Sequence, residues 1–199
     1  SMYGGTCINI ACIPTKTLIV TAEKGLDFEQ AMNEKNAVTT RLNGKNYATI
    51  AGTGVDIIDA TARFLSNKVI EIQAGDEKEE LTAETIIINT GAVPTILPIS
   101  GLAESKFAVD STGIQRLENL PKRLGVLGGG PIGLEFAHLY NTLGSQVTVL
   151  DASETFLPRI EPSIVALAKS YLEEDGIQFL QGVHTQEIKD VQNSLTVVT

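Results

Sequence analysis

The chain has 199 residues, of which 43% are hydrophobic and 20% charged, and its formal net charge is -9. This composition is typical of a globular protein of one or two domains and excludes a disordered chain. The negative charge repels nucleic acid and anionic lipid, so we favour a small-molecule or protein substrate and expect no nucleic acid or membrane partner. No uninterrupted apolar run approaches the roughly 20 residues that cross a bilayer, and no signal peptide is visible. We expect a cytoplasmic protein.

Two cysteines, Cys7 and Cys12, are separated by four residues. In a reducing compartment so close a pair is typical of redox chemistry or metal binding, because a secreted disulfide scaffold needs more cysteines that join distant segments. A zinc site needs about four ligands, and His138 and His184 do not have zinc-finger spacing. The thioredoxin-type spacing C-x-x-C is also absent. Spacing alone leaves two interpretations open, a redox pair and two inert buried thiols.

The first part of the chain predicts two helices. One runs from Cys7 to Glu23, with Pro14 in its first turns, and the second covers residues 31–42. Residues five positions apart do not stack on a regular helix, so a Cys7–Cys12 disulfide would need an irregular first turn. The glycine pair before Cys7 and Pro14 after Cys12 permit one. A thiol near a helix N-terminus has a stabilised thiolate, which thiol–disulfide exchange requires.

Short β-type runs follow these helices. They cover residues 55–59, 62–64, 69–73 and 85–89, with a polar turn at 75–78. In the last run, Ile86-Ile87-Ile88 is continuous rather than alternating, which predicts a strand buried on both faces. Thr90-Gly91 stops this strand, and residues 94–121 predict a loop. We place a domain boundary at the start of this loop.

From residue 124 onward the pattern alternates between strands and helices. Strands are predicted over 124–127, 146–150 and 177–181, and helices over 131–143 and 162–175. Residues 187–192 and 195–199, around Asn193-Ser194, predict a hairpin. Strand–helix alternation at these lengths indicates a parallel sheet with right-handed crossovers.

A glycine-rich segment, residues 128–133, fits the pattern G-x-G-x-x-G. It follows an apolar strand and opens a helix, which is the context that dinucleotide binding requires. Gly128 permits the tight turn, Gly130 lets the backbone approach a pyrophosphate, and Gly133 lets helix and strand pack closely. Asp151 ends the next strand, where a carboxylate accepts hydrogen bonds from both ribose hydroxyls and repels a 2′-phosphate. We therefore favour NADH over NADPH, with a ligand-free glycine turn as the alternative.

The segment Gly4–Lys16 reads Gly-Gly-Thr-Cys-x-Asn-x-x-Cys-Ile-Pro-Thr-Lys. It resembles the active-site signature of the class I pyridine nucleotide-disulfide oxidoreductases, which include dihydrolipoamide dehydrogenase, glutathione reductase, mercuric reductase and hypothiocyanous acid reductase. Further matching segments follow in the family's order: Asn46-Tyr47 after the second helix, Thr90–Pro94, Asp110-Ser111 and Gly128–Ala137. The resemblance covers essentially the whole chain.

The resemblance implies an α/β fold in three layers with a small antiparallel β element. Residues 1–93 would form a partial FAD-binding domain that carries the redox disulfide. Residues 94–199 would form an incomplete Rossmann-like NAD(P)-binding domain. Intact family members are homodimers.

The resemblance also implies roles for individual residues. Cys7 would be the interchange thiol that meets the substrate, Cys12 the charge-transfer thiol against the flavin, and Lys16 would lie near the flavin N5 and pair with Glu135. Electrons would pass from NAD(P)H through FAD to the disulfide, and then to a disulfide or similar oxidised substrate. The implied cofactor-binding residues are Gly5, Thr6, Thr90, Gly91, Gly128, Gly130, Ile132, Gly133 and Asp151. No metal ligand is implied.

Two parts of the family pattern have no counterpart in this sequence: the first flavin-binding glycine turn, and the C-terminal interface domain with its histidine. We therefore expect a fragment that does not hold FAD, has no reductase turnover, and exposes apolar surfaces that favour self-association. The alternatives are a stand-alone nucleotide-binding or thiol-sensing module and a non-functional truncated remnant. The last four residues of the signature, Ile-Pro-Thr-Lys, resemble the branch of hypothiocyanous acid and mercuric reductases more than glutathione reductase.

Overall fold

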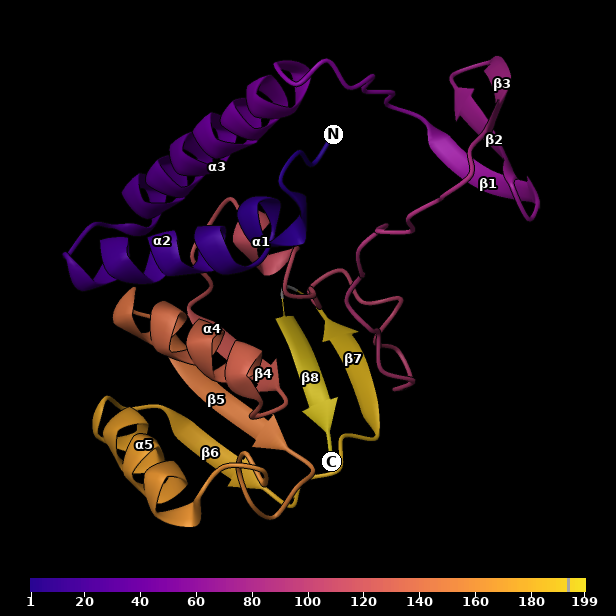
Figure 1. Ribbon diagram of the computed structural model, residues 1–199. Helices are drawn as coiled ribbons and strands as arrows, with labels where there is room; N and C mark the ends of the chain where they lie inside the picture. The colour runs from indigo at the N-terminus through magenta and orange to yellow at the C-terminus, as the bar shows by residue number, and fades with distance from the viewer. Residues whose placement is uncertain (193) are drawn as a thin grey trace.

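The computed structural model describes residues 1–192 and 194–199, and it has a mixed α/β fold (Figure 1). The N-terminal elements are three helices, α1 (Gly5–Asn9), α2 (Cys12–Glu23) and α3 (Phe28–Ala51), followed by the strands β1 (Thr61–Ser66), β2 (Val69–Ala74) and β3 (Glu77–Thr82). After a long linker that contains the short 3-10 helix Ile114–Arg116, the C-terminal elements are β4 (Arg123–Leu127), α4 (Pro131–Thr142), β5 (Gln146–Asp151), α5 (Pro162–Glu174), β6 (Gln178–Gln181), β7 (Glu187–Val191) and β8 (Ser194–Val198).

The single helix predicted over Cys7–Glu23 is in fact two helices with a break at Ile10 and Ala11. Pro14 explains the break, because it has no N–H to donate to the carbonyl four residues earlier. Ala11 leaves the helical region altogether, with φ -134° and ψ -101°. The irregular start that a disulfide between the cysteines would need is therefore confirmed.

Helix α3 is longer at both ends than the predicted 31–42. It begins at a capping box, in which the backbone N–H of Gln30 donates to Asp27 Oδ1 (2.8 Å) and the backbone N–H of Asp27 donates to Gln30 Oε1 (3.1 Å). Its second half is rich in Asn, Thr and Gly, which are poor helix formers, so the sequence pattern ends too early. Asn46-Tyr47, expected after this helix, consequently lies inside it.

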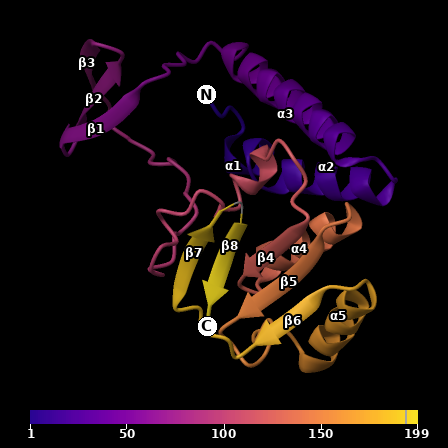
Figure 2. The same cartoon turned by 180° about the vertical axis from the view of Figure 1, so that it is seen from behind.

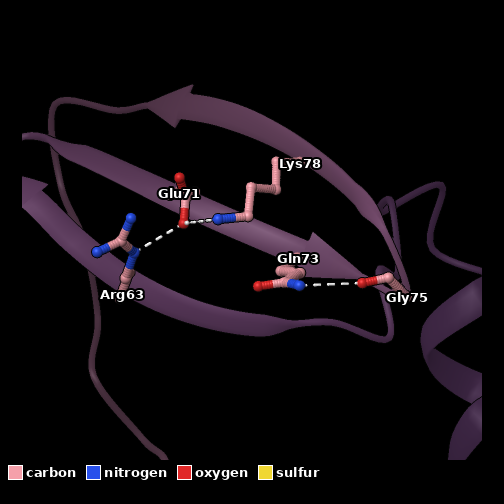
Figure 3. A network of polar contacts seen from close by, with 5 residues as sticks. All are labelled: Arg63, Glu71, Gln73, Gly75 and Lys78. Atoms are coloured by element: carbon pink, nitrogen blue, oxygen red, sulfur yellow. Dashed lines mark hydrogen bonds and ion pairs between the residues drawn. The ribbon is translucent and has the colours of Figure 1, made fainter.

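Strands β1, β2 and β3 form an antiparallel sheet in that order. On the central strand, Glu71 Oε1 accepts from Arg63 Nε (2.7 Å) and lies 3.5 Å from Lys78 Nζ (Figure 3). The hydrogen bond from Arg63 is the main reason why the pKa of Glu71 is lowered. Because the Arg63 and Lys78 side chains are exposed, although Glu71 is only 14% exposed, these ion pairs fix the strand register more than they stabilise the fold. Strand β3 replaces part of the polar turn expected over residues 75–78.

Two predicted strands are wrong. Residues 55–59 and 85–89 form no strand, and Ile87 and Ile88 are 85% and 69% exposed instead of buried. A strand needs a neighbour for its N–H and C=O groups, and none of the described residues pairs with either segment. The apolar run 85–89 therefore lies on the surface.

The C-terminal half follows the predicted alternation. Strands β4, β5 and β6 form a parallel sheet in that order, with Val126 opposite Val149 and Val149 opposite Phe179. Helix α4 packs on β4 and β5, and α2 packs on the other side of α4, so one core joins the N-terminal helices to the sheet (Figure 1). The buried side chains of this core include Leu18, Phe136, Leu139, Tyr140, Val147 and Val149.

The predicted hairpin is strands β7 and β8, although Asn193 of its turn lies outside the described residues. The linker runs beside β7 in both views (Figures 1 and 2). It is joined to that strand by the hydrogen bond from the backbone N–H of Ile188 to the carbonyl of Ser100 (2.8 Å). A Cβ at Gly101 would lie 2.1 Å from the Ile188 carbonyl oxygen, so only glycine permits this approach.

By length and composition, Gly5–Glu23 is apolar enough to cross a membrane, although it contains no uninterrupted apolar run of that length. In this structure the stretch is broken between α1 and α2, and α2 packs against α3 and α4 with Leu18 in the core. A core helix passes the same test of composition, and the packing of α2 is that of a core helix.

Candidate active site

The two cysteines lie on either side of the helix break, Cys7 in α1 and Cys12 at the start of α2, and both are exposed free thiols. The hydrogen bond between their side chains is the main reason why the pKa of Cys7 is raised. The backbone N–H groups of Cys12 and Ile13 act in the opposite direction and lower the pKa of Cys7. The stabilisation expected at a helix start is therefore present but outweighed by the neighbouring thiol. Two accessible, neighbouring thiols are what reversible disulfide formation requires.

Asn9 holds the short helix that carries Cys7. Its Nδ2 donates to the carbonyls of Gly5 (2.8 Å) and Tyr3 (3.1 Å), and its Oδ1 accepts from Asn43 Nδ2 (2.7 Å). Asn43 lies on α3, so the loop and the helix that flank Cys7 are tied to a long rigid element.

Lys16, four residues beyond Cys12 on α2, forms an ion pair with Glu135 on α4. The pairing expected from the family resemblance is therefore confirmed, whereas the roles of both residues in catalysis stay predictions. Their side chains are 56% and 40% exposed, so solvent screens the pair and its stabilising effect is small. Its effect is geometric, because it joins α2, which begins at Cys12, to α4.

The two segments expected to bind flavin lie next to each other. Gly91 has φ 81°, and a Cβ there would lie 3.5 Å from Thr6 Oγ1. Gly5 has φ 72° and open space where its Cβ would be. Thr90-Gly91 thus adjoins the start of α1. At Gly5 no side chain blocks the access of a ligand to the backbone.

The glycine turn has the geometry that its pattern predicts. Gly128 has φ 103°, and a Cβ at Gly133 would lie 2.2 Å from the carbonyl oxygen of Gly128. At Gly130 a Cβ would meet nothing within 4 Å, so the space beside this backbone is open. Gly130 is also the N-cap of α4 and supplies no side-chain cap; since Pro131 has no N–H, the groups left for an anion are the backbone N–H groups of Ile132 and Gly133. Ile132 is exposed on the first turn.

Asp151 is the last residue of β5 and faces the glycine turn. Its Oδ2 accepts from the backbone N–H of Gly129 (2.7 Å), and its Oδ1 accepts from the backbone N–H of Ser153 (2.7 Å). Each carboxylate oxygen has a second lone pair, so the side chain can still accept from ribose hydroxyls. The buried ring of Phe156, which no motif marked, packs so close to Gly129 that a Cβ there would lie 2.3 Å from it.

The histidines lie away from the cysteines. His138 on α4 faces Glu23 Oε1 (3.5 Å from Nε2) and Asp175 Oδ2 (3.9 Å from Nδ1), and His184 is exposed in the loop after β6. Within residues 1–192 and 194–199, no three His, Cys, Asp or Glu side chains are arranged to hold a metal ion.

A buried polar cluster that no motif marked surrounds the 3-10 helix. Gln115 Nε2 donates to the carbonyls of Ile10 (2.9 Å) and Ser111 (2.8 Å), and the carbonyl of Gln115 accepts from Lys35 Nζ (2.6 Å). Burial, and to a lesser degree the charge of Arg116, lowers the pKa of Lys35. Pro14 signals only that the Ile10 carbonyl needs another donor, because proline has no N–H; it does not show that Gln115 supplies it.

Comparison with known proteins gives one consistent result. The family model described as pyridine nucleotide-disulphide oxidoreductase matches residues 1–199. The chain is 40% identical over 198 residues to the Escherichia coli protein described as "Probable pyridine nucleotide-disulfide oxidoreductase RclA", covering 99% of this chain and 45% of that protein. It is 31% identical over 199 residues to a dihydrolipoyl dehydrogenase from Mycoplasma pneumoniae, covering 89% of this chain and 43% of that protein.

Among solved structures, the HOCl-induced flavoprotein disulfide reductase RclA from Escherichia coli superposes with a TM-score of 0.95 at 40% sequence identity. The match covers 100% of this chain and 45% of that chain. The chain thus spans a little under half the length of the relatives that it matches.

Proposed function

Since this chain belongs to the pyridine nucleotide-disulphide oxidoreductase family, we propose that it is the electron-transferring segment of an FAD-dependent NAD(P)H:disulfide oxidoreductase. The observation that carries the proposal is the pair of exposed free thiols, Cys7 and Cys12, on either side of the break between α1 and α2. Next to them, the ion pair of Lys16 with Glu135 links the cysteine-bearing helix to the helix that the glycine turn opens. In this proposal residues 1–93 belong to the flavin domain and residues 94–199 to the nicotinamide domain.

The residues present fit both cofactors in the segments that would contact the pyrophosphate, the ribose and the flavin. Gly130 and the free N–H groups of α4 would hold a dinucleotide pyrophosphate, and Asp151 would hold a ribose. Thr6 and Gly91 would lie along the flavin, with Lys16 as the nearby cation. When bound, nicotinamide and flavin supply the two electrons that reduce the Cys7–Cys12 disulfide.

The reduced pair would then act on the substrate by thiol–disulfide exchange. The Cys7 thiolate, assisted by the N–H groups of Cys12 and Ile13, attacks one sulfur of a substrate disulfide and releases the other as a thiolate that takes up a proton. The Cys12 thiolate then attacks the Cys7 sulfur, releases the second substrate thiol and closes the Cys7–Cys12 disulfide. Two electrons pass from the cysteine pair to the substrate.

We propose NADH as the preferred nucleotide, because the Asp151 carboxylate at the end of β5 would repel a 2′-phosphate. For the substrate we favour a small oxidised sulfur compound, since the solved relative is described as an HOCl-induced disulfide reductase. We also expect the 199-residue chain to bind NADH without retaining FAD, because residues 123–142 form the one strand–glycine turn–helix unit with this pattern in the described part of the chain.

The test has two arms. Oxidised with glutathione disulfide, the chain should form one internal disulfide, detected by mass spectrometry after thiol alkylation, and the Cys12→Ser variant should form none. Calorimetric titration should show saturable binding of NADH and binding of NADPH at least tenfold weaker. If neither the disulfide nor nucleotide binding is found, the non-functional remnant is the better account. If the disulfide forms without nucleotide binding, the thiol-sensing module is favoured instead.

A further inference from the structure

The break between α1 and α2 leaves one carbonyl without its helical partner. In a continuous helix the C=O of Ile10 would accept from the N–H of residue 14, and Pro14 has no N–H. With φ -144° at Ile10 and φ -134° at Ala11, the chain has left the helix at this point. The conformation of these two residues sets the separation of Cys7 from Cys12, because they lie between them.

Gln115 supplies the missing donor from 105 residues away in the sequence. Its side-chain Nε2 lies 2.9 Å from the Ile10 carbonyl oxygen and 2.8 Å from that of Ser111, and the residue is only 4% exposed. Both partners are acceptors, so the amide must present its NH₂ group to them. Its Oε1 is buried without a hydrogen-bond partner, which shows that the two donated bonds dictate the orientation.

The backbone around Gln115 is held from two further helices. Lys35 of α3 donates through Nζ to the carbonyl of Gln115 (2.6 Å), and the Tyr140 hydroxyl of α4 donates to the carbonyl of Ile114 (2.6 Å). The turn that carries the Gln115 amide is therefore held in place by α3 and α4. The amide does not move together with Ile10 and Ala11 if these two residues change conformation. A fixed donor of this kind restricts Ile10 to one position.

We propose that Gln115 is a positioning residue for the Cys7–Cys12 pair, holding the Ile10 carbonyl and thereby the helix break that brings the two sulfurs together. The inference rests on the proposed redox role of the pair. Gln115 touches neither sulfur and acts through the backbone of Ile10 alone. Without it, the break samples more conformations, and the effective concentration of one thiol at the other falls.

The experiment measures the equilibrium between the chain and glutathione. In this exchange the two Cys thiols lose two electrons and two protons and form one S–S bond, while one glutathione disulfide becomes two glutathione thiols. The full chain is equilibrated at several glutathione ratios, quenched with acid and alkylated, and the fraction of Cys7–Cys12 disulfide is read by mass spectrometry. Gln115→Met, which keeps the length of the side chain without donors, should lower the equilibrium constant roughly tenfold, equivalent to about 30 mV.

Ser145→Ala is the matched control. Ser145 is also 4% exposed, and its Oγ donates to a backbone carbonyl, that of Pro121, at 2.6 Å. This variant should lower the thermal unfolding midpoint and leave the disulfide equilibrium unchanged. Gln115→Asn, whose shorter amide cannot span the same distance, should reproduce the shift of Gln115→Met and serves if the Met variant does not fold.

A wild-type equilibrium constant in the folded Gln115 variants would overturn the proposal, and so would an equal shift in Ser145→Ala. A wild-type chain that forms no disulfide at any glutathione ratio would instead contradict the proposed function itself.

Discussion

At the scale of single residues, Gly130 and Gly133 serve different purposes in the glycine turn. Gly130 leaves space for a nucleotide pyrophosphate, and Gly133 permits close packing of helix and strand. Gly130 has φ -73° and open space at its Cβ position, so Gly130→Ala should fold, with only the loss that alanine causes at an N-cap, about 1 kcal/mol. The added methyl would occupy the space that the pyrophosphate needs, and NADH affinity should fall at least tenfold, about 1.4 kcal/mol. Calorimetric titration and thermal unfolding check the two expectations.

Gly133→Ala should impair both properties, because its methyl would lie 2.2 Å from the carbonyl oxygen of Gly128. The strand and helix must then move apart, which lowers the unfolding midpoint as well as NADH affinity. Equal NADH affinity in Gly130→Ala and the wild type would contradict the assignment of this turn to a dinucleotide.

How much of the site can be predicted from sequence depends on how local its determinants are. The glycine turn and the break near the cysteines follow from Gly128, Gly133 and Pro14, which act within a few residues. Gln115 could not be found in this way, because its partner Ile10 is 105 residues away and no motif links them. The residues of the Lys16–Glu135 pair are 119 positions apart, and their pairing was expected only from the family resemblance.

At the scale of elements, the hairpin β7–β8 holds the linker through a carboxylate. Asp190 Oδ1 accepts from Ser105 Oγ (2.6 Å) and Oδ2 from the backbone N–H of Lys106 (2.9 Å). The bond from Ser105 is the main reason why the pKa of Asp190 is lowered. A lowered carboxyl pKa stabilises the folded contact above the unfolded value of about 3.9, and this stabilisation is lost as pH falls through the folded value.

We expect the linker residues 102–109 to be protected from hydrogen exchange at pH 6 and to lose protection when Asp190 is replaced by Asn. Asn keeps one acceptor but removes the charge, so both bonds weaken. Hydrogen–deuterium exchange resolved by peptide gives the measurement, with β4–β6 as the internal reference. Unchanged protection of residues 102–109 in Asp190→Asn would show that the Ser100–Ile188 hydrogen bond suffices to hold the linker.

Whether a predicted strand forms in this protein depends on the elements that lie beside it. Residues 146–150 and 85–89 are both rich in β-branched or apolar residues, but only the former lies between two other strands. Propensity describes how well a residue suits a sheet, and pairing depends on neighbours that a single segment does not reveal. The apolar run 85–89 is therefore the clearest case in which local pattern and tertiary context disagree.

At the scale of the whole molecule, this exposed run predicts self-association. Ile87 and Ile88 combine high exposure with a backbone that no described strand pairs, so this apolar segment is free to pair with a second chain. Sedimentation velocity should show concentration-dependent association of the wild type and a monomer for Ile88→Lys. The control is Ile164→Lys, an exposed apolar position on α5 whose backbone is already hydrogen-bonded in a helix. Equal association in Ile88→Lys and the wild type would locate the contact elsewhere.

Helix α4 has a consequence that reaches across the molecule. It starts at the glycine turn, its next turn carries Glu135 to Lys16, and its last turn carries Tyr140 to the carbonyl beside Gln115. A helix of this length moves as a rod, so a small tilt at its first turn displaces all these contacts together. Under the proposed function, nucleotide bound at the glycine turn would thus act through α4 on both contacts, the Lys16–Glu135 pair and the turn that carries Gln115, and the Cys7–Cys12 equilibrium would depend on NADH.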